Sequence, residues 1–594
     1  MPPTPDLSSA GSRRGPLQER GERSRHCCSP PPTLFAWWGG VGGGGCVHER
    51  LDASIERITT TLAALIALTV ATPIISIVVL AFAPTDDLWP HLIAYVLPQA
   101  LRDTTLLLLG VGIVALIAGA GTAWLVSLYD FRGRAMMLWL LPLPLAIPTY
   151  LAAYVYVDLF EPLGLFHALL KQWLPPRDAI NLLQQMRSLP GAIVVIGFVL
   201  YPYVYLSARA MFQLQSAEFA EAARVLGASR WTIFRRVSLP MARPALAVGL
   251  ALVSLETLND IGASEYLGVR TLTVSIFTTW LNRGSLSGAA QLSVFMLVIV
   301  ALLIVIERRG RRDAEMSSES PRLMPRVMVR GWRGALALLA CWTPVLIGFA
   351  IPFAYLLYQS LRRGLFTQGN AALWRDAGHS LLFASIATVI ALLLVLIVLL
   401  AQRWRRNTWT TLSASMAQTG YALPGLVLAL GLLTPVLAID GALNTIAAWF
   451  GHEAQGLVMI GSGAAVVIAY VIRFLAVPIG FIKAGFDRIP IDYDDSARSV
   501  GASRLRTLGR VQLPLLRPAL LGAVIVVFVD CLKELPATLL LRPLNVETLA
   551  TSIYQYASRG SFEDGAAAAL LIVAASIPPV IWLTRFADMR KGPD

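Results

Sequence analysis

The sequence predicts an all-α polytopic membrane protein with about twelve transmembrane helices arranged in two parallel repeats of six. Three observations predict this fold. The 594 residues are 56% hydrophobic and only 14% charged, whereas soluble domains are about 25% charged. Long apolar runs recur along the chain, and most reach the ~20 residues that a helix needs to cross a bilayer. Motifs of the first half return in the second half in the same order.

Twelve apolar segments are expected to be helices, because lipid cannot satisfy the hydrogen bonds of an open backbone. They are residues 58–83, 104–128, 136–159, 191–212, 244–263, 289–306, 334–358, 379–401, 413–438, 457–481, 518–538 and 565–583. Most of the 49 Lys and Arg residues lie on one side of these spans, for example Arg308 after the sixth and Arg403 after the eighth. Because cytoplasmic loops are rich in Lys and Arg, we expect that side and both termini to be cytoplasmic.

The segments outside the spans complete the expected organisation. Residues 1–57 are rich in Pro, Gly, Ser and Arg, so we expect a disordered basic tail. The alternative is a start downstream of Met1, although the next methionine is Met136. The first repeat is expected over 58–306, a cytoplasmic linker over 307–333 and the second repeat over 334–594. The five cysteines have no metal-type spacing, so no metal site is expected.

Two loops, within residues 216–245 and 490–519, carry the strongest internal repeat. Residues 221–245 read EAARVLGASRWTIFRRVSLPMARPA, and residues 495–519 read DSARSVGASRLRTLGRVQLPLLRPA. Aligned without gaps, 13 of these 25 positions are identical. Each repeat has an even number of spans, so the halves share one orientation and are related by an axis along the membrane normal. A single pathway between the halves is therefore expected.

Each loop is expected to form two short helices with a turn between them. Gly227 and Gly501 mark the turns, since glycine accepts backbone angles that other residues resist. Ser229 and Ser503 follow and are expected to cap the second short helix. A passive interfacial loop is the alternative, but it would need a bulky apolar face, and these loops offer Ala, Gly and Arg instead.

These loops resemble the EAA loop of bacterial ABC importer permeases. The first copy matches it at Glu221, Ala222, Ala223, Gly227, Val237, Leu239 and Pro240. The second copy departs at Asp495 and Ser496 and keeps Ala497, Gly501, Val511, Leu513 and Pro514. The Leu-Pro pairs are expected to end each loop, before Arg243-Pro244 and Arg517-Pro518 begin the next spans.

The resemblance implies a function as well as a fold, that of a type I importer permease in the bacterial inner membrane. Each loop would seat in a groove of a separate ATPase subunit, with Asp495 standing in for the glutamate of the motif. Two copies of that ATPase are implied, together with an external or periplasmic substrate-binding protein and the lipid bilayer. The chain itself would bind no cofactor and no nucleic acid, and the partner ATPase would use the ATP.

Motifs of ATP binding and hydrolysis are absent from the sequence. A P-loop needs Gly-Lys-Ser/Thr to hold phosphates, and none of the four lysines precedes Ser or Thr. Neither HExxH nor GxSxG occurs. We therefore expect a transport subunit with no catalytic residue, not an enzyme.

Two further segments resemble the fused ferric-iron permeases within this class. They are Glu256 to Gly262 followed by Thr271 to Thr273, and Lys533 to Thr538 followed by Leu539 to Pro543. The resemblance implies transport of ferric iron. Thiamine, phosphonate and polyamine-like substrates remain alternatives. A gradient-driven secondary transporter shares the arrangement of twelve spans in two parallel halves, but it would not need the twin loops.

Ionisable residues in the fifth and eleventh spans are the candidate lining of the pathway. Charges at membrane depth are costly, and they usually face a cavity or one another. The candidates are Glu256, Asn259, Asp260, Asp530, Lys533 and Glu534. The equal alternative is a structural set in which Lys533 neutralises a neighbouring carboxylate. Arg473 and the tyrosines of the third and fourth spans are expected to pack between helices or at the interface.

Overall fold

The computed structural model describes residues 42–85, 88–161, 166, 172, 175, 186–214, 223, 225–312, 326–364, 371–453 and 456–589. The chain divides into the units Met1–Leu51 and Asp52–Asp594. Of the first unit only residues 42–51 are described, and they begin helix α1 (Gly42–Ala81). The end of the predicted disordered tail is therefore helical. Its Glu56 lies 2.9 Å from Arg504, an ion pair that favours order in this part of the chain.

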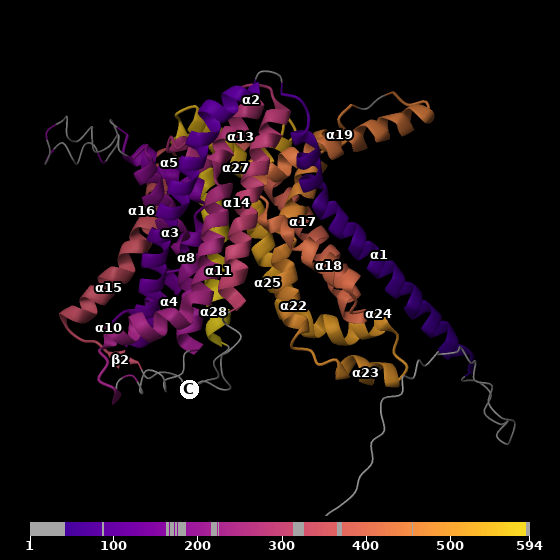
Figure 1. Ribbon diagram of the computed structural model, residues 1–594, viewed down its shortest axis with the longest axis horizontal. Coiled ribbons are helices and arrows are strands. Elements are labelled where there is room, and N and C mark those ends of the chain that lie inside the picture. Colours follow the sequence, from indigo (N-terminus) through magenta and orange to yellow (C-terminus); the bar gives the residue numbers. More distant parts are fainter. Residues whose placement is uncertain are drawn as a thin grey trace, which may run out of the picture. The chain divides into compact units, whose positions relative to one another are not determined.

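The first half is built from helices and one short strand (Figure 1). After α1 they are α2 (Leu88–His91), the π-helix η1 (Leu92–Val96), α3 (Leu97–Leu128), β1 (Tyr129–Asp130), α4 (Arg134–Leu140), the 3-10 helix η2 (Leu143–Ala146), α5 (Thr149–Leu159), α8 (Leu189–Leu214), α10 (Arg230–Ile233), the π-helix η3 (Phe234–Ser238), α11 (Leu239–Asn259), α12 (Ile261–Tyr266), α13 (Leu272–Leu281) and α14 (Leu286–Arg312).

The second half begins with the second strand and continues with helices. They are β2 (Val327–Met328), α15 (Trp332–Val345), the π-helix η4 (Leu346–Ala350), α16 (Ile351–Arg362), α17 (Ala371–Trp404), α18 (Thr408–Ala417), the 3-10 helix η5 (Thr419–Ala422), α19 (Gly425–Trp449), α20 (Val458–Gly461), α21 (Ala464–Phe474), α22 (Ala476–Phe486), α23 (Asp492–Ser499), α24 (Arg504–Thr507), the π-helix η6 (Leu508–Gln512), α25 (Leu513–Leu532), α26 (Pro536–Leu541), α27 (Leu549–Ser558), the 3-10 helix η7 (Phe562–Gly565) and α28 (Ala566–Met589). The two strands pair in parallel, with Tyr129 opposite Val327.

The predicted all-α membrane fold is confirmed. Within the described residues, ten helices are long and apolar enough to cross a membrane, and the number is twelve if each of two bent helix pairs is one span. In the first bent pair, α4 with η2 meets α5 at 88°. Pro148 lies at this bend, where its ring leaves no backbone N–H to continue a helix. The predicted third span is therefore broken.

Two predicted spans of the second half are displaced along the sequence. By length and composition the ninth apolar helix is α19, Gly425–Trp449, and not 413–438. Pro424 precedes it and stops the helical turns of η5, as Pro148 does in the first half. The tenth span is the second bent pair, α21 with α22 at 45°, and it begins after Gly463 and not at residue 457. Gly463 has a φ of 79°, which ends the short helix α20.

The two halves exchange their outer helices. One hydrophobic cluster joins α1, α13 and α14 of the first half to α17, α19, α21 and α25 of the second. The other joins α3, α5 and α8 of the first half to α15, α16, α27 and α28 of the second. Neither half therefore completes a hydrophobic core without helices from the other, although the sequence repeat alone suggests two separate bundles.

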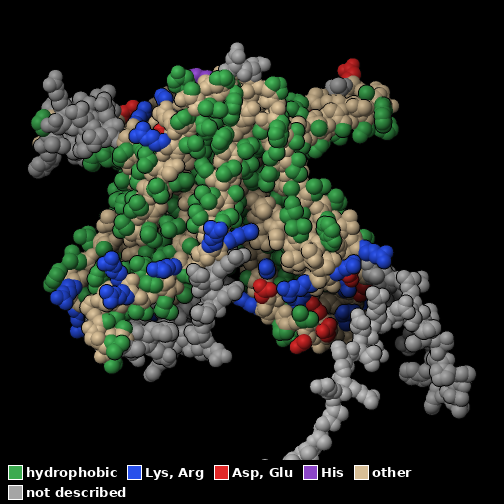
Figure 2. All heavy atoms as spheres, in the orientation of Figure 1, with side chains coloured by type: hydrophobic (Ala, Val, Ile, Leu, Met, Phe, Trp, Pro, Cys, Tyr) green, Lys and Arg blue, Asp and Glu red, His purple; other side chains and the backbone are tan. Residues whose placement is uncertain are grey.

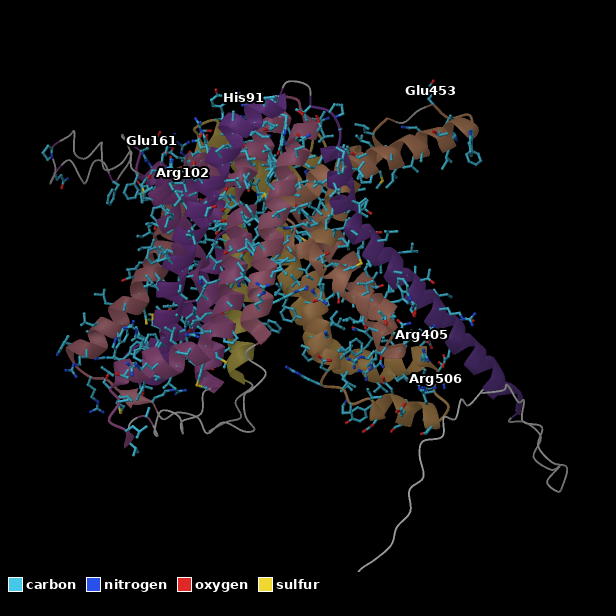
Figure 3. All side chains as sticks on the ribbon, viewed as in Figure 1. His91, Arg102, Glu161, Arg405, Glu453 and Arg506 are labelled. Atoms are coloured by element: carbon cyan, nitrogen blue, oxygen red, sulfur yellow. The ribbon has the colours of Figure 1, made fainter. Side chains whose placement is uncertain are left out.

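Charged and apolar side chains segregate along the helices. Figure 2 shows hydrophobic side chains over the flanks of the helices, and many Lys and Arg side chains at the end where α10 and α24 lie. Arg405 and Arg506 lie at this end, whereas His91 and Arg102 lie at the opposite end (Figure 3). The end with α10 and α24 is the one that the Lys and Arg distribution predicts to be cytoplasmic.

The close packing of α3 against α8 gives a test of the fold. A Cβ at Gly119 would lie 2.8 Å from the Tyr201 carbonyl oxygen, whereas a Cβ at Gly121 would meet nothing within 4 Å. We expect Gly119→Leu to lower the thermal unfolding midpoint of the purified protein by several degrees, because overpacking costs about 1–3 kcal/mol. Gly121→Leu is the matched control, and an equal shift in both variants would contradict this packing.

Candidate functional site

A small cavity is lined by both halves of the chain. Its volume is about 80 Å³, and its walls come from α5, α8 and α11 of the first half and from α21, α25 and α26 of the second. All six predicted pathway residues line it, namely Glu256, Asn259, Asp260, Asp530, Lys533 and Glu534. The structure therefore brings these residues together, while their role in transport stays a prediction.

The six residues form three pairs that the internal repeat relates. The offset of 274 that aligns the two loops also aligns Glu256 with Asp530, Asn259 with Lys533 and Asp260 with Glu534. In each half these residues lie where a long helix ends and a short one begins, α11 before α12 and α25 before α26. The pairing places the same three positions of both repeats around one cavity.

The third pair caps the short helices. Oδ1 of Asp260 accepts the Ala263 backbone N–H at 2.8 Å. Glu534 accepts the N–H groups of Ala537 and Thr538, both at 3.0 Å. A carboxylate at a helix start satisfies N–H groups that have no partner inside the helix. Asp260 and Glu534, 6% and 4% exposed, therefore hold the shape of the cavity wall.

Asn259 and Arg473 connect the halves across the cavity. Oδ1 of Asn259 accepts the Gly425 backbone N–H at 2.6 Å and Nη1 of Arg473 at 2.7 Å. The same Arg473 nitrogen lies 3.8 Å from Oε1 of Glu534. A Cβ at position 425 would lie 2.3 Å from Nη1 of Arg473, so only glycine lets the arginine come this close to the backbone. Arg473 was expected to be a packing or interfacial residue, but it is 5% exposed and takes part in the cavity.

A second contact between the halves lies beside the first. Tyr421, from η5, donates its hydroxyl to Oε1 of Glu256 at 2.9 Å. Lys533 pairs with Asp530 at 2.8 Å, the neutralising contact that the structural alternative expects. Sequence reasoning missed Tyr421 and Arg473, because their partners lie more than 160 residues away in the chain. No local pattern indicates such a contact.

The expected tyrosine cluster divides into two groups. Tyr150 and Tyr203 line the cavity. Tyr156 and Tyr201 instead donate to backbone carbonyl oxygens, of Ile347 and Leu141, each at 2.6 Å. No group of three or more His, Cys, Asp or Glu residues is arranged to hold a metal ion in the described part of the chain. The cavity therefore offers charged and phenolic groups but no chelating cluster among those residues.

The two loops have the same backbone geometry at their glycine turns. Gly227 and Gly501 both have a φ of 79°, the left-handed region that favours glycine. In the first loop the Ala228 N–H bonds the Ala223 carbonyl oxygen at 2.9 Å, and in the second the Ala502 N–H bonds that of Ala497 at 3.0 Å. These bonds close a helix C-terminus, so the predicted turn at each glycine is confirmed.

The serines after the glycines cap the next helix, as predicted. Oγ of Ser229 accepts the Thr232 N–H at 3.2 Å, and Oγ of Ser503 accepts the Arg506 N–H at 3.4 Å. The predicted loop ends are wrong, however. The helices pass through the π-turns η3 and η6 directly into α11 and α25, which begin at Leu239 and Leu513. Pro240 and Pro514 lie in these first turns, where a missing N–H costs little.

The tips of the loops present aliphatic side chains that sequence reasoning missed. Leu226 and Val500 occupy equivalent positions and are 86% and 82% exposed. Asp495 is exposed on the first turn of α23, and Ala497 is half-buried. Glu221 and Ala222, the first two residues of the EAA match, lie outside the described residues. The signal for the tips was present in the sequence as an aliphatic residue directly before each glycine.

Comparison with known proteins identifies the family. The family described as "Binding-protein-dependent transport system inner membrane component" matches residues 112–309 and again residues 394–591. The chain belongs to this family. Each match includes one loop and one set of cavity residues, and the two matches make the protein a fused permease with many apolar spans of an inner-membrane component.

Individual relatives of this permease differ in how much of it they cover. It is 23% identical to "Fe(3+)-transport system permease protein FbpB 2" of Haemophilus influenzae over 494 residues, which cover 82% of this chain and 90% of the relative. It is 32% identical to "Sulfate transport system permease protein CysW" of Escherichia coli over 33% of this chain and 68% of the relative. It is 27% identical to "Molybdenum transport system permease protein ModB" of Escherichia coli over 32% of this chain and 86% of the relative.

Charged groups hold the second loop of the permease in place. Arg403 at the end of α17 donates Nε to Asp494 of the second loop at 2.7 Å and donates to the Phe486 and Ile489 carbonyl oxygens at 3.3 and 3.2 Å. Gln512 donates to the other carboxylate oxygen of Asp494 at 2.9 Å.

The aromatic contact of the first loop is formed by three rings. The ring of Phe234 lies 4.6 Å from that of Trp124 on α3 and 5.4 Å from that of Trp231, measured between centroids. Aromatic pairs at such distances contribute packing energy that salt does not screen. Among the described residues, the first loop therefore contacts α3 through aromatic packing.

The Arg403 network predicts local opening of the second loop. We expect Arg403→Ala to speed amide hydrogen exchange over residues 492–499 by about tenfold or more, because a hydrogen bond to a charged group contributes about 1.5–3 kcal/mol. Hydrogen-exchange mass spectrometry measures the effect, with Arg406→Ala at an exposed neighbouring arginine as the control. Unchanged exchange in Arg403→Ala would show that α23 is held by other contacts.

Proposed function

We propose that this permease imports ferric iron across the bacterial inner membrane, powered by two copies of a separate ATPase and supplied by an external binding protein. The observation that carries the proposal is the matched turn of the two loops, in which Gly227 and Gly501 both have a φ of 79° and each precedes a serine-capped helix. A gradient-driven transporter has no use for such a pair. The loops and both termini are assigned to the cytoplasm because Lys and Arg gather at that end.

The loop tips support docking of an ATPase at two equivalent sites. Leu226 and Val500 project from the turns with more than four-fifths of their surface exposed. Exposed aliphatic side chains of this kind gain free energy when a partner's groove covers them. Because α10 and α24 continue through π-turns into α11 and α25, a movement of either docked loop reaches the cavity along one helix.

The extent of similarity supports iron as the substrate. The relative named for Fe(3+) transport is matched over 82% of this chain, whereas the relatives named for sulfate and molybdenum transport are each matched over about a third. An oxyanion is the second candidate, since Arg473 and Lys533 place two cations in the cavity wall. The four carboxylates of the same wall favour a cation.

The contacts across the cavity support a role as a gate between the halves. Asn259 and Glu256 of the first half bond Arg473, Gly425 and Tyr421 of the second. A cavity of about 80 Å³ holds no more than a few water molecules. Substrate passage therefore requires the two halves to separate and these bonds to break, as alternating access demands. In this proposal Asp260 and Glu534 shape the gate and Asn259 with Arg473 closes it.

A double substitution tests the docking role. We expect Gly227→Val with Gly501→Val to reduce uptake more than tenfold at normal protein level, because a β-branched residue at positive φ costs more than ~1–2 kcal/mol at each turn. Uptake in cells or proteoliposomes is the measurement. Gly509→Val is the matched control, since Gly509 lies in the same loop with ordinary φ and open space around it. Normal uptake by the double variant would refute docking through these turns.

A reconstituted assembly tests the substrate. With the ATPase and a candidate binding protein in proteoliposomes, we expect ATP hydrolysis to rise when the binding protein carries Fe(III) and not when it is empty. The same assay with binding proteins that carry sulfate or molybdate tests the oxyanion candidate. Stimulation by an oxyanion-loaded protein, with none by the iron-loaded one, would replace iron as the substrate and leave the docking role intact.

A further inference from the structure

The far end of α19 forms a hairpin that leaves the bundle. The outer hairpin, defined as residues 437–461, comprises the last turns of α19, the described part of the connection and α20. A Cβ at Gly431 would lie 2.3 Å from the Pro73 carbonyl oxygen of α1, and Val436 is the last residue of α19 in the buried hydrophobic cluster. From Leu437 onward most side chains are exposed.

The exposed surface of the outer hairpin is apolar. Its large exposed hydrophobic residues are Leu437, Ile439, Leu443, Ile446, Trp449, Phe450 and Leu457. Trp449 and Phe450 are 81% and 77% exposed, more than most large apolar side chains of the described residues. No Lys or Arg occurs between residues 437 and 461. Such a contiguous apolar surface marks a contact with lipid or with another protein.

Two polar side chains of the helix bond the returning arm of the hairpin. Asp440, 1% exposed, accepts the Met459 backbone N–H at 2.7 Å. Asn444 donates to the Gly456 carbonyl oxygen at 2.9 Å. Gly456 and Gly451 have φ values of 72° and 75°, which let the chain reverse direction. The bonds hold the two arms of the hairpin together and direct the apolar residues outward.

The direction of the hairpin indicates which partner covers it. At 1.5 Å per residue, the 13 residues from Val436 to Trp449 extend ~20 Å, and Figure 1 shows that this end of α19 runs sideways, away from the other helices. Beside its root, Ile75 and Val79 of helix α1 are exposed at 52% and 64%, and Phe82, directly after α1, is exposed at 86%. The apolar surface of the hairpin continues this lipid-facing surface.

We propose that the outer hairpin lies in the outer interface of the bilayer, with Trp449 and Phe450 inserted among the phospholipid acyl chains. Aromatic residues favour this depth, and an interfacial helix needs an apolar outer face. The charged residue Glu453 lies in the returning connection and points away from the helix (Figure 3), as expected for a residue at the aqueous edge. A docking surface for a soluble protein would carry a polar rim with charged residues, and the hairpin has no basic residue.

The inference does not depend on the substrate, and it gives the gate an attachment to the membrane. The same helix begins at Gly425, whose N–H bonds Asn259 in the cavity wall, and ends at Trp449 in the hairpin. A hairpin anchored in the outer leaflet would keep one end of α19 at fixed depth while the halves move. The bilayer is thereby the partner that holds this side of the gate.

Fluorescence quenching tests the depth of the outer hairpin. The full chain is used with Cys27, Cys28 and Cys46 changed to Ser, while the buried Cys341 and Cys531 stay in place. A bimane label is attached at Trp449→Cys, and the protein is placed in vesicles of phosphatidylcholine and phosphatidylglycerol. We expect doxyl groups on the lipid chains to quench bimane at position 449 at least about twofold more than bimane at Glu453→Cys. The reason is that the apolar face of an interfacial helix lies among the lipid chains, whereas Glu453 faces water. Aqueous iodide should show the reverse order.

Two outcomes would overturn the proposal. Equal or stronger iodide quenching at 449, with no doxyl quenching, would place the hairpin in water. Shielding from iodide at 449 that arises only when a binding protein is added would make the hairpin a protein-docking surface. Ile446→Cys, on the same apolar surface, repeats the measurement with the two aromatic residues intact, so a folding defect at 449 cannot decide the result.

Discussion

The demand that lipid places on the backbone governs this structure. Every N–H and C=O group at membrane depth needs a partner, so the spans are helices, and a break in a helix must be repaired by side chains. Breaks occur at Pro148 and Pro424 and at the junctions of α11 with α12 and of α25 with α26. Asp260, Glu534 and Asn259 provide acceptors for the freed N–H groups at these places. The polar cavity exists because the helices around it are interrupted.

Much of the architecture could be predicted because it depends on short stretches of sequence. Apolar runs locate the twelve spans, and the repeated loop predicts both glycine turns and both serine caps. The six cavity residues could be named because they are charged or polar in apolar surroundings and recur in both halves. The ninth and tenth spans were displaced, since periodicity alone does not reveal that Pro424 stops one helix and that Gly463 precedes another.

Contacts between distant parts of the chain could not be predicted. Arg473 has ordinary apolar neighbours in sequence, and only the fold places it 2.7 Å from Asn259. Tyr421 and Arg403 acquire their roles in the same way, from carboxylates on other helices. The exchange of outer helices between the halves is a further case. A repeat shows that two segments resemble each other, but it does not say which of them pack together.

The exchanged helices also set the order in which the protein can mature. During synthesis α3, α5 and α8 enter the membrane long before α27 and α28 have been translated, yet these late helices close the hydrophobic cluster of the early ones. The first half must therefore wait, incompletely packed, until the last span has been inserted. For nearly the whole time of translation, the first half is therefore a partly packed intermediate that is exposed to membrane quality control. Loss of the final helix would leave the beginning of the protein, as much as its end, without a completed core.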